Sequence, residues 1–544
     1  MFFRWDNGGD NGGEMDGNWW KKSVVYQIYP RSFCDSNGDG IGDLRGIIGK
    51  LDYIASLGVD VIWLSPIYLS PNEDNGYDIS SYTEINPEYG TMEDFDALVA
   101  EASRRGLKIV MDLVINHTST EHQWFRLSRK GVEPYKDFYY WSDSWPGTPN
   151  NWTGFFGGGT WCYDSERKAS YLHLFAPHQA DLNYHNPLLW EKIEEILRFW
   201  LDKGVKGFRC DVINILYKDS LKNGRKRLIL TGSEHYLTLP GTHEILKRLN
   251  SVVKEYDGFT VGETVFVDIE DARKLTLPER KELDMVFSFR HMETDQIIVK
   301  WFKKRFSWKR FISTLSLWQN ELPWNSIYFE NHDQPRSVSR FGSLEYRQQS
   351  AKLLSLLLLT LKGTPFIYQG EEIGMTNFDF QGMDEIRDVE SKNIYSILSS
   401  IPLPEALRWR IIKASSRDNA RTPMQWTKEK GSGFSSSSSS PWLGINRNSA
   451  EINVEVENED PSSVLIFYRT LLKLRKNCRD LLEGDFRLES NGRRLTVYRR
   501  GDVMVMLNHS GKSIRVEEKG KVVLSTYLEH ENGVLKPWEG IIVK

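Results

Sequence analysis

Short apolar segments alternate with amphipathic segments along most of the chain. The apolar segments are rich in Val, Ile and Phe, which is typical of buried strands. Eight are predicted as strands, at 23–30, 59–66, 108–115, 205–212, 259–264, 284–289, 325–330 and 364–369. Amphipathic patterns at 92–105, 187–203 and 243–256 predict helices between them. Strands that alternate with helices favour an α/β fold, here a (β/α)8 TIM barrel, with a doubly wound open sheet as the alternative.

The barrel pattern is interrupted once and then followed by a different pattern. About 90 residues separate the third and fourth predicted strands, too many for one helix, so we expect an inserted lobe after strand 3. After a charged helix near 462–476, short alternating strands predict an antiparallel β-sandwich domain. The serine run 435–440 is expected to be a mobile loop. The expected organisation is a flexible leader at 1–17, a catalytic barrel at 18–117 and 182–479, the lobe at 118–181 and the β domain at 480–544.

Composition narrows the class of protein. With 544 residues, the chain exceeds the size of a single core, and 40% hydrophobic and 12% aromatic residues fit a globular enzyme. A formal net charge of -4 provides no basic surface for nucleic acid and favours small neutral substrates. The four cysteines have no metal-type spacing and fit reduced thiols; they are Cys34, Cys162, Cys210 and Cys478.

The sequence also gives an expectation about location. The N-terminus lacks the apolar core of a signal peptide, and the most apolar stretch, 353–361, is shorter than the about 20 residues that span a bilayer. We therefore expect a cytoplasmic monomer that makes no contact with membranes.

Acidic residues stand at the ends of four predicted strands. They are Asp112, Asp211, Glu263 and Asp333. In a barrel, residues at the C-terminal ends of the strands converge on one mouth. Glycoside cleavage needs one carboxylate at the anomeric carbon and one carboxylic acid at the leaving oxygen, so this set predicts an enzyme acting on sugars.

The segments around these acids resemble a known family. Segments 112–117, 207–211, 261–263 and 331–333, together with 179–183, are similar to the motif regions of the α-amylase family of glycoside hydrolases, family 13. The resemblance extends from about Trp19 to the C-terminus, and its oligo-1,6-glucosidase branch fits best. It implies double displacement with retention of configuration and no cofactor for the chemistry.

By this resemblance, Asp211 is the nucleophile, Glu263 is the acid that later acts as base, and Asp333 orients sugar hydroxyls. A retaining pair is expected about 5 to 5.5 Å apart, with Glu263 protonated while Asp211 is ionised. Arg209 lies on the same strand face as Asp211 and is expected to hold its ionised form, unless it serves only a barrel ion pair.

The resemblance also implies a set of residues that bind the cleaved glucose. His117 and His332 match a pair of neutral imidazoles that donate to its hydroxyls, although either histidine alone could be structural. Tyr77 is expected to stack on the sugar, and Asp78 with Arg421 to bind its terminal 4-hydroxyl and close the pocket; a rim ion pair is the alternative. Two further residues complete the predicted set, Phe156 and Gln179.

A loop after the first strand is predicted to bind calcium. Residues 35–43 carry oxygen ligands at every second position and glycines for a tight turn, without the distant glutamate of an EF-hand. The resemblance implies one structural Ca²⁺, and a solvated turn is the alternative. The implied ligands are Asp35, Asn37, Asp39, the Ile41 carbonyl and Asp43.

The substrate is predicted with several alternatives open. Val212 after the nucleophile resembles enzymes that prefer α-1,6 bonds, and the segment 363–377 resembles both oligo-1,6-glucosidases and trehalose-6-phosphate hydrolases. Glu293 replaces the lysine typical of phosphate-reading members. Ala180 and Glu330 depart from the oligo-1,6-glucosidase pattern. The preferred hypothesis is an exo-acting α-glucosidase for isomaltose-like oligosaccharides, with α-1,4 bonds as a second linkage. Trehalose-6-phosphate hydrolase, sucrose isomerase and a non-enzymatic transporter heavy chain are the alternatives.

Overall fold

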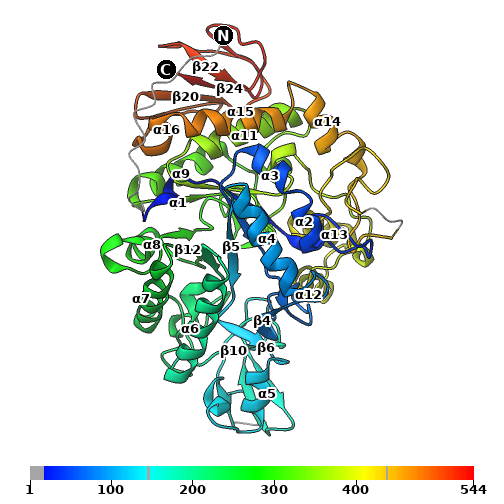
Figure 1. Cartoon of the computed structure of the whole chain (residues 1–544), viewed down its shortest axis with the longest axis vertical. Coiled ribbons are helices and arrows are strands. Elements are labelled where there is room, and N and C mark those ends of the chain that lie inside the picture. Colours follow the sequence, from blue (N-terminus) through cyan, green and yellow to red (C-terminus); the bar gives the residue numbers. More distant parts are fainter. Residues whose placement is uncertain (1–16, 144–146, 436–438) are drawn as a thin grey trace.

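The computed structural model describes residues 17–143, 147–435 and 439–544. It shows a barrel, a lobe that projects from one side of it and a β domain at the other end (Figure 1). The predicted leader, apart from Gly17, and the centre of the serine run lie outside the described residues.

The barrel sheet contains eight parallel strands, and each overlaps one predicted from the sequence. The strands run in the order β13-β12-β11-β5-β2-β1-β17-β16. Neighbours in the sheet are therefore successive barrel strands along the chain, except that the first strand, β1, pairs with the last, β17. Their bounds are β1 Val25–Ile28, β2 Val61–Leu64, β5 Lys108–Leu113, β11 Gly207–Cys210, β12 Phe259–Glu263, β13 Met285–Phe287, β16 Ser326–Ile327 and β17 Thr364–Tyr368. The predicted barrel is confirmed, and the open-sheet alternative is excluded.

Side chains close the barrel between β13 and β16. These two strands form no ladder in the described sheet. Instead, the Ser326 hydroxyl donates to the Val286 carbonyl at 2.7 Å, and the Tyr328 hydroxyl donates to the Ser288 carbonyl at 2.9 Å. These bonds satisfy carbonyls that a ladder would otherwise use.

Helices cover the outside of the barrel. Side chains cap the N-termini of two of the long helices. Thr91 and Asp94 form a capping box at α4, and the Asn186 side chain caps α6 before Pro187. The barrel helices are α1 Trp19–Lys22, α2 Leu44–Ile48, α3 Leu51–Leu57, α4 Met92–Arg104, α6 Pro187–Asp202, α7 Pro240–Glu255, α8 Ile269–Thr276, α9 Trp308–Glu321, α10 Ser337–Phe341 and α11 Arg347–Thr360. None of the helices in the described ranges is long and apolar enough to cross a membrane.

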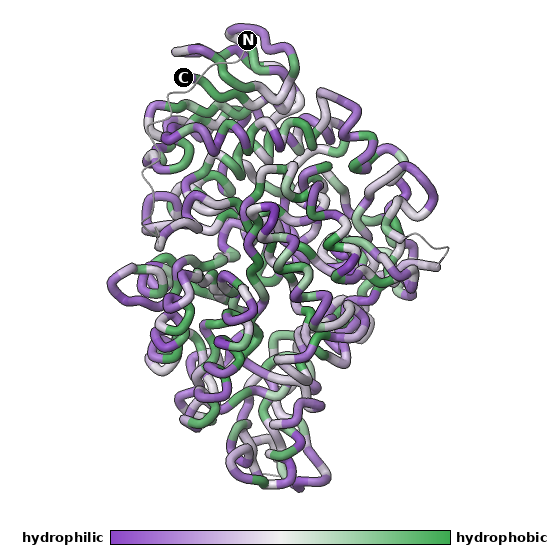
Figure 2. The backbone as a smooth tube through the Cα atoms, viewed as in Figure 1, coloured by the Kyte–Doolittle hydropathy of each residue, from purple (hydrophilic) through white to green (hydrophobic). Residues whose placement is uncertain are grey.

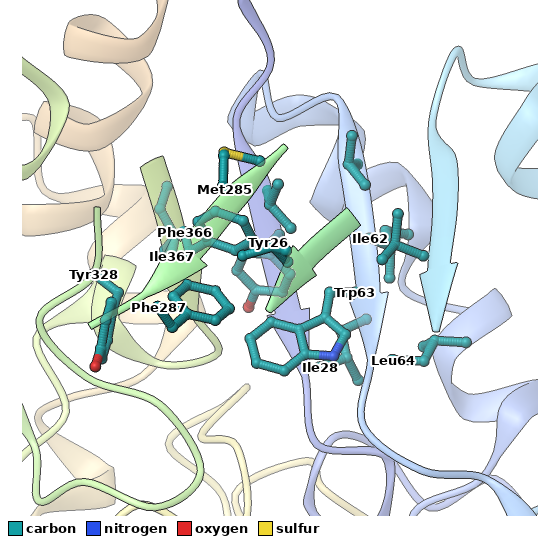
Figure 3. Packing of buried hydrophobic residues seen from close by; sticks show 14 of the residues in the cluster. Tyr26, Ile28, Ile62, Trp63, Leu64, Met285, Phe287, Tyr328, Phe366 and Ile367 are labelled. Atoms are coloured by element: carbon teal, nitrogen blue, oxygen red, sulfur yellow. The ribbon is translucent and has the colours of Figure 1, made fainter. Parts of the chain in front are cut away.

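Large apolar side chains fill the barrel (Figure 3). The ring of Trp63 stacks on Phe287 with centroids 5.7 Å apart, and Phe366 meets Phe287 edge-on at 4.6 Å. The tube in Figure 2 is hydrophobic along the central strands and more polar on the outer helices. Burial of these faces stabilises the barrel by roughly 25 cal/mol per Å² of apolar surface removed from water, so the strand ends that carry the acids rest on a rigid base.

The lobe follows β5 and contains a small antiparallel sheet. Strands β7 Trp141–Ser142, β9 Ala169–Leu172 and β8 Trp161–Asp164 pair in that order, beside helix α5 Gln123–Arg129. A second pair, β6 His117–Ser119 and β10 Gln179–Asp181, ties the lobe to the barrel mouth. This pair carries His117 and Gln179 together.

A further group of elements surrounds the mouth. The hairpin β3 Tyr68–Leu69 and β4 Ser81–Ile85 follows β2, and the hairpin β14 Gln296–Ile297 and β15 Val299–Lys303 follows β13. Helices α12 Val389–Ser399 and α13 Glu405–Ser415 follow β17, before the short 3-10 helix η8 Arg417–Asn419.

The C-terminal domain is an antiparallel β domain, as predicted. It follows α14 Val454–Glu459, α15 Val464–Lys476 and α16 Arg479–Glu483. Its five-stranded sheet has the order β18 Phe486–Asn491, β19 Leu495–Arg500, β20 Val503–Asn508, β24 Gly540–Val543 and β22 Val522–Ser525, and β21 Ile514–Arg515 pairs with β23 Val534–Leu535.

Candidate active site

One buried guanidinium joins three of the acids at the barrel mouth. Arg209 on β11 lies 2.5 Å from an Asp112 oxygen, 2.7 Å from an Asp211 oxygen and 2.6 Å from Glu263 Oε2. Its side chain is only 2% exposed. Since β5, β11 and β12 are adjacent, the parallel register brings these side chains together. The predicted contact between Arg209 and Asp211 is therefore present, and it extends to Glu263.

The backbone turns sharply after Asp211. Val212 has φ 35° and ψ 41°, in the left-handed region that a β-branched residue rarely adopts. Hydrogen bonds hold this conformation: the Asp211 N–H donates to the Leu113 carbonyl at 2.9 Å, and the Val212 N–H donates to Glu263 Oε2 at 3.4 Å. The turn thus links the carboxyl group of Asp211 to that of Glu263.

Asp211 and Glu263 share the guanidinium of Arg209. Burial raises the pKa of Asp211; Arg209 lowers it, whereas the charge of Glu263 and a side-chain hydrogen bond to Glu263 raise it further. The net result is an Asp211 pKa well above its usual range. Asp211 therefore retains its proton to higher pH than an isolated aspartate.

Asp333 is kept ionised by cationic neighbours. Burial opposes its ionisation, but His332, Arg417 and Arg421 lower the pKa of Asp333 by more. Burial also lowers the pKa of His332 to about 3, so His332 is neutral at physiological pH and the two guanidiniums supply the positive charge there. Arg421 donates to Asp333 at 2.6 Å.

The two predicted histidines occupy the two sides of Tyr77. The His332 ring is parallel to that of Tyr77, with centroids 5.5 Å apart, and its Nε2 lies 2.6 Å from the Tyr77 hydroxyl. His117 Nε2 lies 3.1 Å from the Tyr77 carbonyl and 3.2 Å from Gln179 Nε2. Burial lowers the pKa of His117 to about 4, so both imidazoles are neutral donors near pH 7.

The structure does not join Asp78 to Arg421 as the sequence suggested. The Asp78 carboxylate accepts from the N–H groups of Glu73 and Asp74, both at 3.0 Å, and from the Ser70 hydroxyl. Burial raises the pKa of Asp78 to about 6, against the effect of these N–H groups. Because its oxygens already stabilise the turn, Asp78 shapes the loop and does not face Arg421.

Asp74 and Arg417 form the pair that was assigned to Asp78 and Arg421. Arg417 donates to an Asp74 oxygen at 3.1 Å, and Gln179 donates to the other Asp74 oxygen at 3.3 Å. Their side chains are 5% and 6% exposed. Both residues lie four positions along the chain from the predicted ones, so the sequence pointed to the right loops but not to the right side chains.

Phe156 lies beside this pair. The Arg417 guanidinium is 5.6 Å from the centre of the Phe156 ring, and Phe156 meets the ring of Phe175 edge-on at 5.6 Å. Phe175 in turn lies 5.1 Å from the His117 ring. The lobe therefore contributes an aromatic wall to the mouth, and Phe175 was not predicted.

Ion pairs also occur in the segments that follow β13. Each of four cations has a carboxylate partner: Arg290 with Glu293 at 3.3 Å, Lys300 with Glu390 at 2.5 Å, and both Arg340, at 2.7 Å, and Lys303, at 3.4 Å, with Asp295. Burial lowers the pKa of Lys303 to about 8. Positive charge is thus present here but is neutralised locally.

The predicted calcium loop is stabilised by its own main chain. The Asp35 carboxylate accepts from the N–H groups of Gly38 and Gly40, and the Asp43 carboxylate accepts from Ser36 and Gly46. Within the described ranges, no three or more His, Cys, Asp or Glu side chains are arranged as a group that could hold a metal ion. Calcium binding would require these carboxylates to exchange N–H donors for the ion, so the site stays a prediction.

The barrel fold and the carboxylates at its mouth together define a class of enzyme, the glycoside hydrolases built on a (β/α)8 barrel. The family described as "Alpha amylase, catalytic domain" matches residues 27–484, and the chain belongs to this α-amylase family. The predicted fold, family and enzyme class are confirmed.

The proteins that are similar to this chain have several different activities. The oligo-1,6-glucosidase of Halalkalibacterium halodurans is 46% identical, over 96% of this chain and 98% of that one. The solved trehalose-6-phosphate hydrolase of Bacillus licheniformis is 44% identical with a TM-score of 0.90, over 97% of this chain and 100% of that one. The isomaltulose synthase of Klebsiella sp. LX3 is 38% identical with a TM-score of 0.92, over 96% and 99%.

Proposed function

We propose that the protein is an exo-acting, retaining α-glucosidase that releases glucose from short neutral oligosaccharides with a terminal α-1,6 bond, such as isomaltose. Terminal α-1,4 bonds are the second linkage within this proposal. The observation that carries it is the pair of carboxylates Asp211 and Glu263, which both contact Arg209 at the barrel mouth. The similarity to oligo-1,6-glucosidases over almost the whole chain supports the choice of linkage.

The chemistry follows from that pair. Asp211 attacks the anomeric carbon to form a covalent glucosyl-enzyme, while Glu263 protonates the leaving oxygen. Glu263 then removes a proton from the water that hydrolyses the intermediate, so the configuration is retained. These roles need one proton within the pair, and the raised pKa of Asp211 in contact with Glu263 supports such sharing.

The proton must lie on Glu263 when the sugar is bound. Arg209 supports this state, because its charge favours an ionised Asp211. Asp333, kept ionised by Arg417 and Arg421, can accept hydrogen bonds from sugar hydroxyls and stabilise positive charge at the anomeric centre. The chemistry needs no cofactor in this proposal.

The exo mode is supported by Asp74 and Arg417. A carboxylate and a guanidinium side by side can accept from and donate to one terminal hydroxyl. Because both are almost completely buried, they close the inner end of the pocket to a longer chain. We assign to them the role first expected of Asp78 and Arg421.

A trehalose-6-phosphate hydrolase is the second candidate, supported by the similarity to the Bacillus licheniformis enzyme. A sugar phosphate brings a dianion that is costly to desolvate without free cationic partners. Two cations in the segments after β13 already have carboxylate partners, Arg290 with Glu293 and Lys300 with Glu390. This pairing favours a neutral leaving sugar.

We also propose that the loop after β1 binds one structural Ca²⁺ ion. The proposed ligands are Asp35, Asn37, Asp39, the Ile41 carbonyl and Asp43, which provide the hard oxygen atoms that calcium prefers. The ion has no part in the reaction.

Substrate competition tests the proposed activity. The protein is incubated with isomaltose, maltose, sucrose and trehalose 6-phosphate, and kcat/KM is compared, while NMR records the anomer first released. Isomaltose is expected to have the highest value, with α-glucose as the first product. Dominance of trehalose 6-phosphate, or release of β-glucose, would contradict the proposal.

The nucleophile is tested by Asp211→Asn, with Asp502→Asn on an exposed turn as the matched control. Asparagine has nearly the same size as aspartate but no charge, so we expect a loss of at least about 10⁴-fold in kcat and no change in the control. Retained turnover would show that another group attacks the sugar.

A further inference from the structure

A groove lies at the base of the lobe, where the lobe meets the barrel (Figure 1). Its walls are strand β4, the segment that leads into α5, and helix α6. Its volume is about 790 Å³, within the range of roughly 300–1,000 Å³ that is typical of small-molecule sites. None of the described residues that line it belongs to the proposed sugar site at the mouth. The groove is therefore a separate candidate for ligand binding.

His122 provides this groove with a free hydrogen-bond donor. The residue is only 5% exposed, and its Nδ1 accepts from the Trp124 N–H at 3.0 Å. The proton of the neutral ring therefore lies on Nε2. Among the described residues Nε2 has no hydrogen-bond partner, and it is not sealed off from the groove. Burial lowers the pKa of His122 to about 3, so the ring remains a neutral donor near pH 7.

Aromatic rings surround this donor. The ring of Trp124 meets His122 edge-on with centroids 4.6 Å apart, and the centre of the Tyr82 ring is 5.5 Å from that of His122. Phe199 on α6 is half-buried and lines the same groove. A sugar has apolar C–H groups on its ring faces and hydroxyls at its edges, so aromatic faces beside a hydrogen-bond donor suit it well.

The charges of the lining favour a neutral ligand. Three carboxylates and two cations line the groove; they are Glu84, Glu121, Glu195, Arg126 and Lys192. Arg126 pairs with Glu121 at 3.2 Å, and Lys192 pairs with Glu195 at 2.8 Å. Since both cations already have carboxylate partners, an anionic ligand would meet a lining of net negative charge. Sugar hydroxyls, in contrast, can donate to these carboxylates.

We propose that this groove is a second, non-catalytic binding site for a neutral oligosaccharide, which accepts from the His122 Nε2–H and packs on the ring of Phe199. Binding here requires no turnover, so the inference goes beyond the proposed function. Only the choice of an α-1,6-linked glucose oligomer as the probe rests on that function. The Tyr82 hydroxyl donates to the His117 carbonyl at 3.2 Å, so the wall of the groove is tied to β6, the strand that carries His117.

The test titrates isomaltotriose into the Asp211→Asn protein by calorimetry, because this variant should bind the sugar without cleaving it. Two sites per chain are expected. Phe199→Ala in the same background removes one aromatic face and should weaken one of the two sites by about tenfold. His122→Asn keeps an acceptor for the Trp124 N–H, since asparagine is a good helix N-cap, but removes the imidazole N–H. It should weaken the same site by about fivefold.

Two further variants separate the groove from the mouth. Asp74→Asn, in the Asp211→Asn background, should weaken only the other site. Leu317→Ala removes an exposed apolar side chain of α9 that does not line the groove, and it should leave both sites unchanged. Thermal unfolding verifies that each variant is folded.

The outcomes distinguish this inference from the proposed function. Binding of isomaltotriose that neither Phe199→Ala nor His122→Asn weakens would overturn the groove site. Tighter binding of glucose 6-phosphate than of glucose in the groove would contradict a neutral ligand. A dimer that sedimentation detects and Phe199→Ala dissociates would assign the groove to a second copy of the chain. Failure of the proposed function would appear instead as a wild type that does not hydrolyse isomaltose, with the groove site still present.

Discussion

Replacing Arg209 by methionine is the sharpest test of the electrostatic design at the mouth. Methionine has similar length but leaves Asp112, Asp211 and Glu263 without the guanidinium that now lies within 2.5–2.7 Å of each. Removing one partner of a buried ion pair costs about 3–5 kcal/mol, a large share of the about 5–15 kcal/mol that stabilises a typical protein. We therefore expect a protein that folds but melts at clearly lower temperature.

The loss should depend on pH, with a defined sign. The pKa of Asp211 in the folded protein is already raised above its unfolded value, and Arg209 is the group that lowers it. Without Arg209 it rises further, so the folded state holds about one more proton than wild type as pH increases. An acid whose pKa is raised on folding stabilises the folded state below its unfolded pKa. This contribution is lost as the pH rises towards the folded pKa. The deficit should therefore grow by up to about 1.4 kcal/mol per pH unit between the folded-state pKa of Asp211 in wild type and its higher value in the variant.

Thermal unfolding at pH 5 and pH 7.5 measures this difference. Between these values the gap between Arg209→Met and wild type should widen, and kcat should fall at both. Arg479→Met, which removes an exposed ion pair with Glu483, is the control and should cost less than about 1 kcal/mol at either pH. A gap that is independent of pH would refute the view that Arg209 controls protonation of these acids.

Two other predictions concern the pocket and the metal. Asp74→Asn should lower kcat/KM on isomaltose by about 10²-fold, because the hydrogen bond from the terminal sugar hydroxyl to a charged carboxylate is lost. The melting temperature should also fall, because Asp74 is a buried partner of Arg417. Kinetics and calorimetry check both, and an unaltered kcat/KM would remove Asp74 from the sugar site. Chelation of calcium by EDTA should lower Tm, and added Ca²⁺ should restore it. The reason is that an ion that binds only the folded state stabilises that state, by about 2.7 kcal/mol at an ion concentration 100 times Kd. In Asp39→Asn this response should shrink; a Tm indifferent to calcium in the wild type would exclude the proposed ion.

The fold was predictable because its signals repeat along the chain. Eight apolar segments separated by helices can bury their faces in few ways, and each predicted strand overlaps an observed one. Strand lengths were overestimated at 325–330, where β16 comprises only Ser326–Ile327. The reason is that apolar side chains continue past the last ladder pair and close the barrel through Tyr328.

The site was predictable to the level of the loop but not of every side chain. Asp74 and Asp78 are separated by a tight turn, in which Asn75 and Gly76 both have positive φ. This turn directs N–H groups at Asp78 and so leaves Asp74 to meet Arg417. Spacing alone does not show which way such a turn faces. The three carboxylates at strand ends required no such knowledge, since the barrel fixes where strand ends point.

The conformation of Val212 has a consequence for how this enzyme can be improved. A β-branched residue in the left-handed region costs on the order of 1–3 kcal/mol, which glycine would avoid. Engineering for heat resistance would therefore select glycine at this position, immediately after Asp211. The added backbone freedom of glycine would loosen the peptide that follows Asp211 and donates to Glu263. A gain in thermal stability at this position would therefore come with slower turnover. Val212 is thus a position where thermal stability and activity conflict.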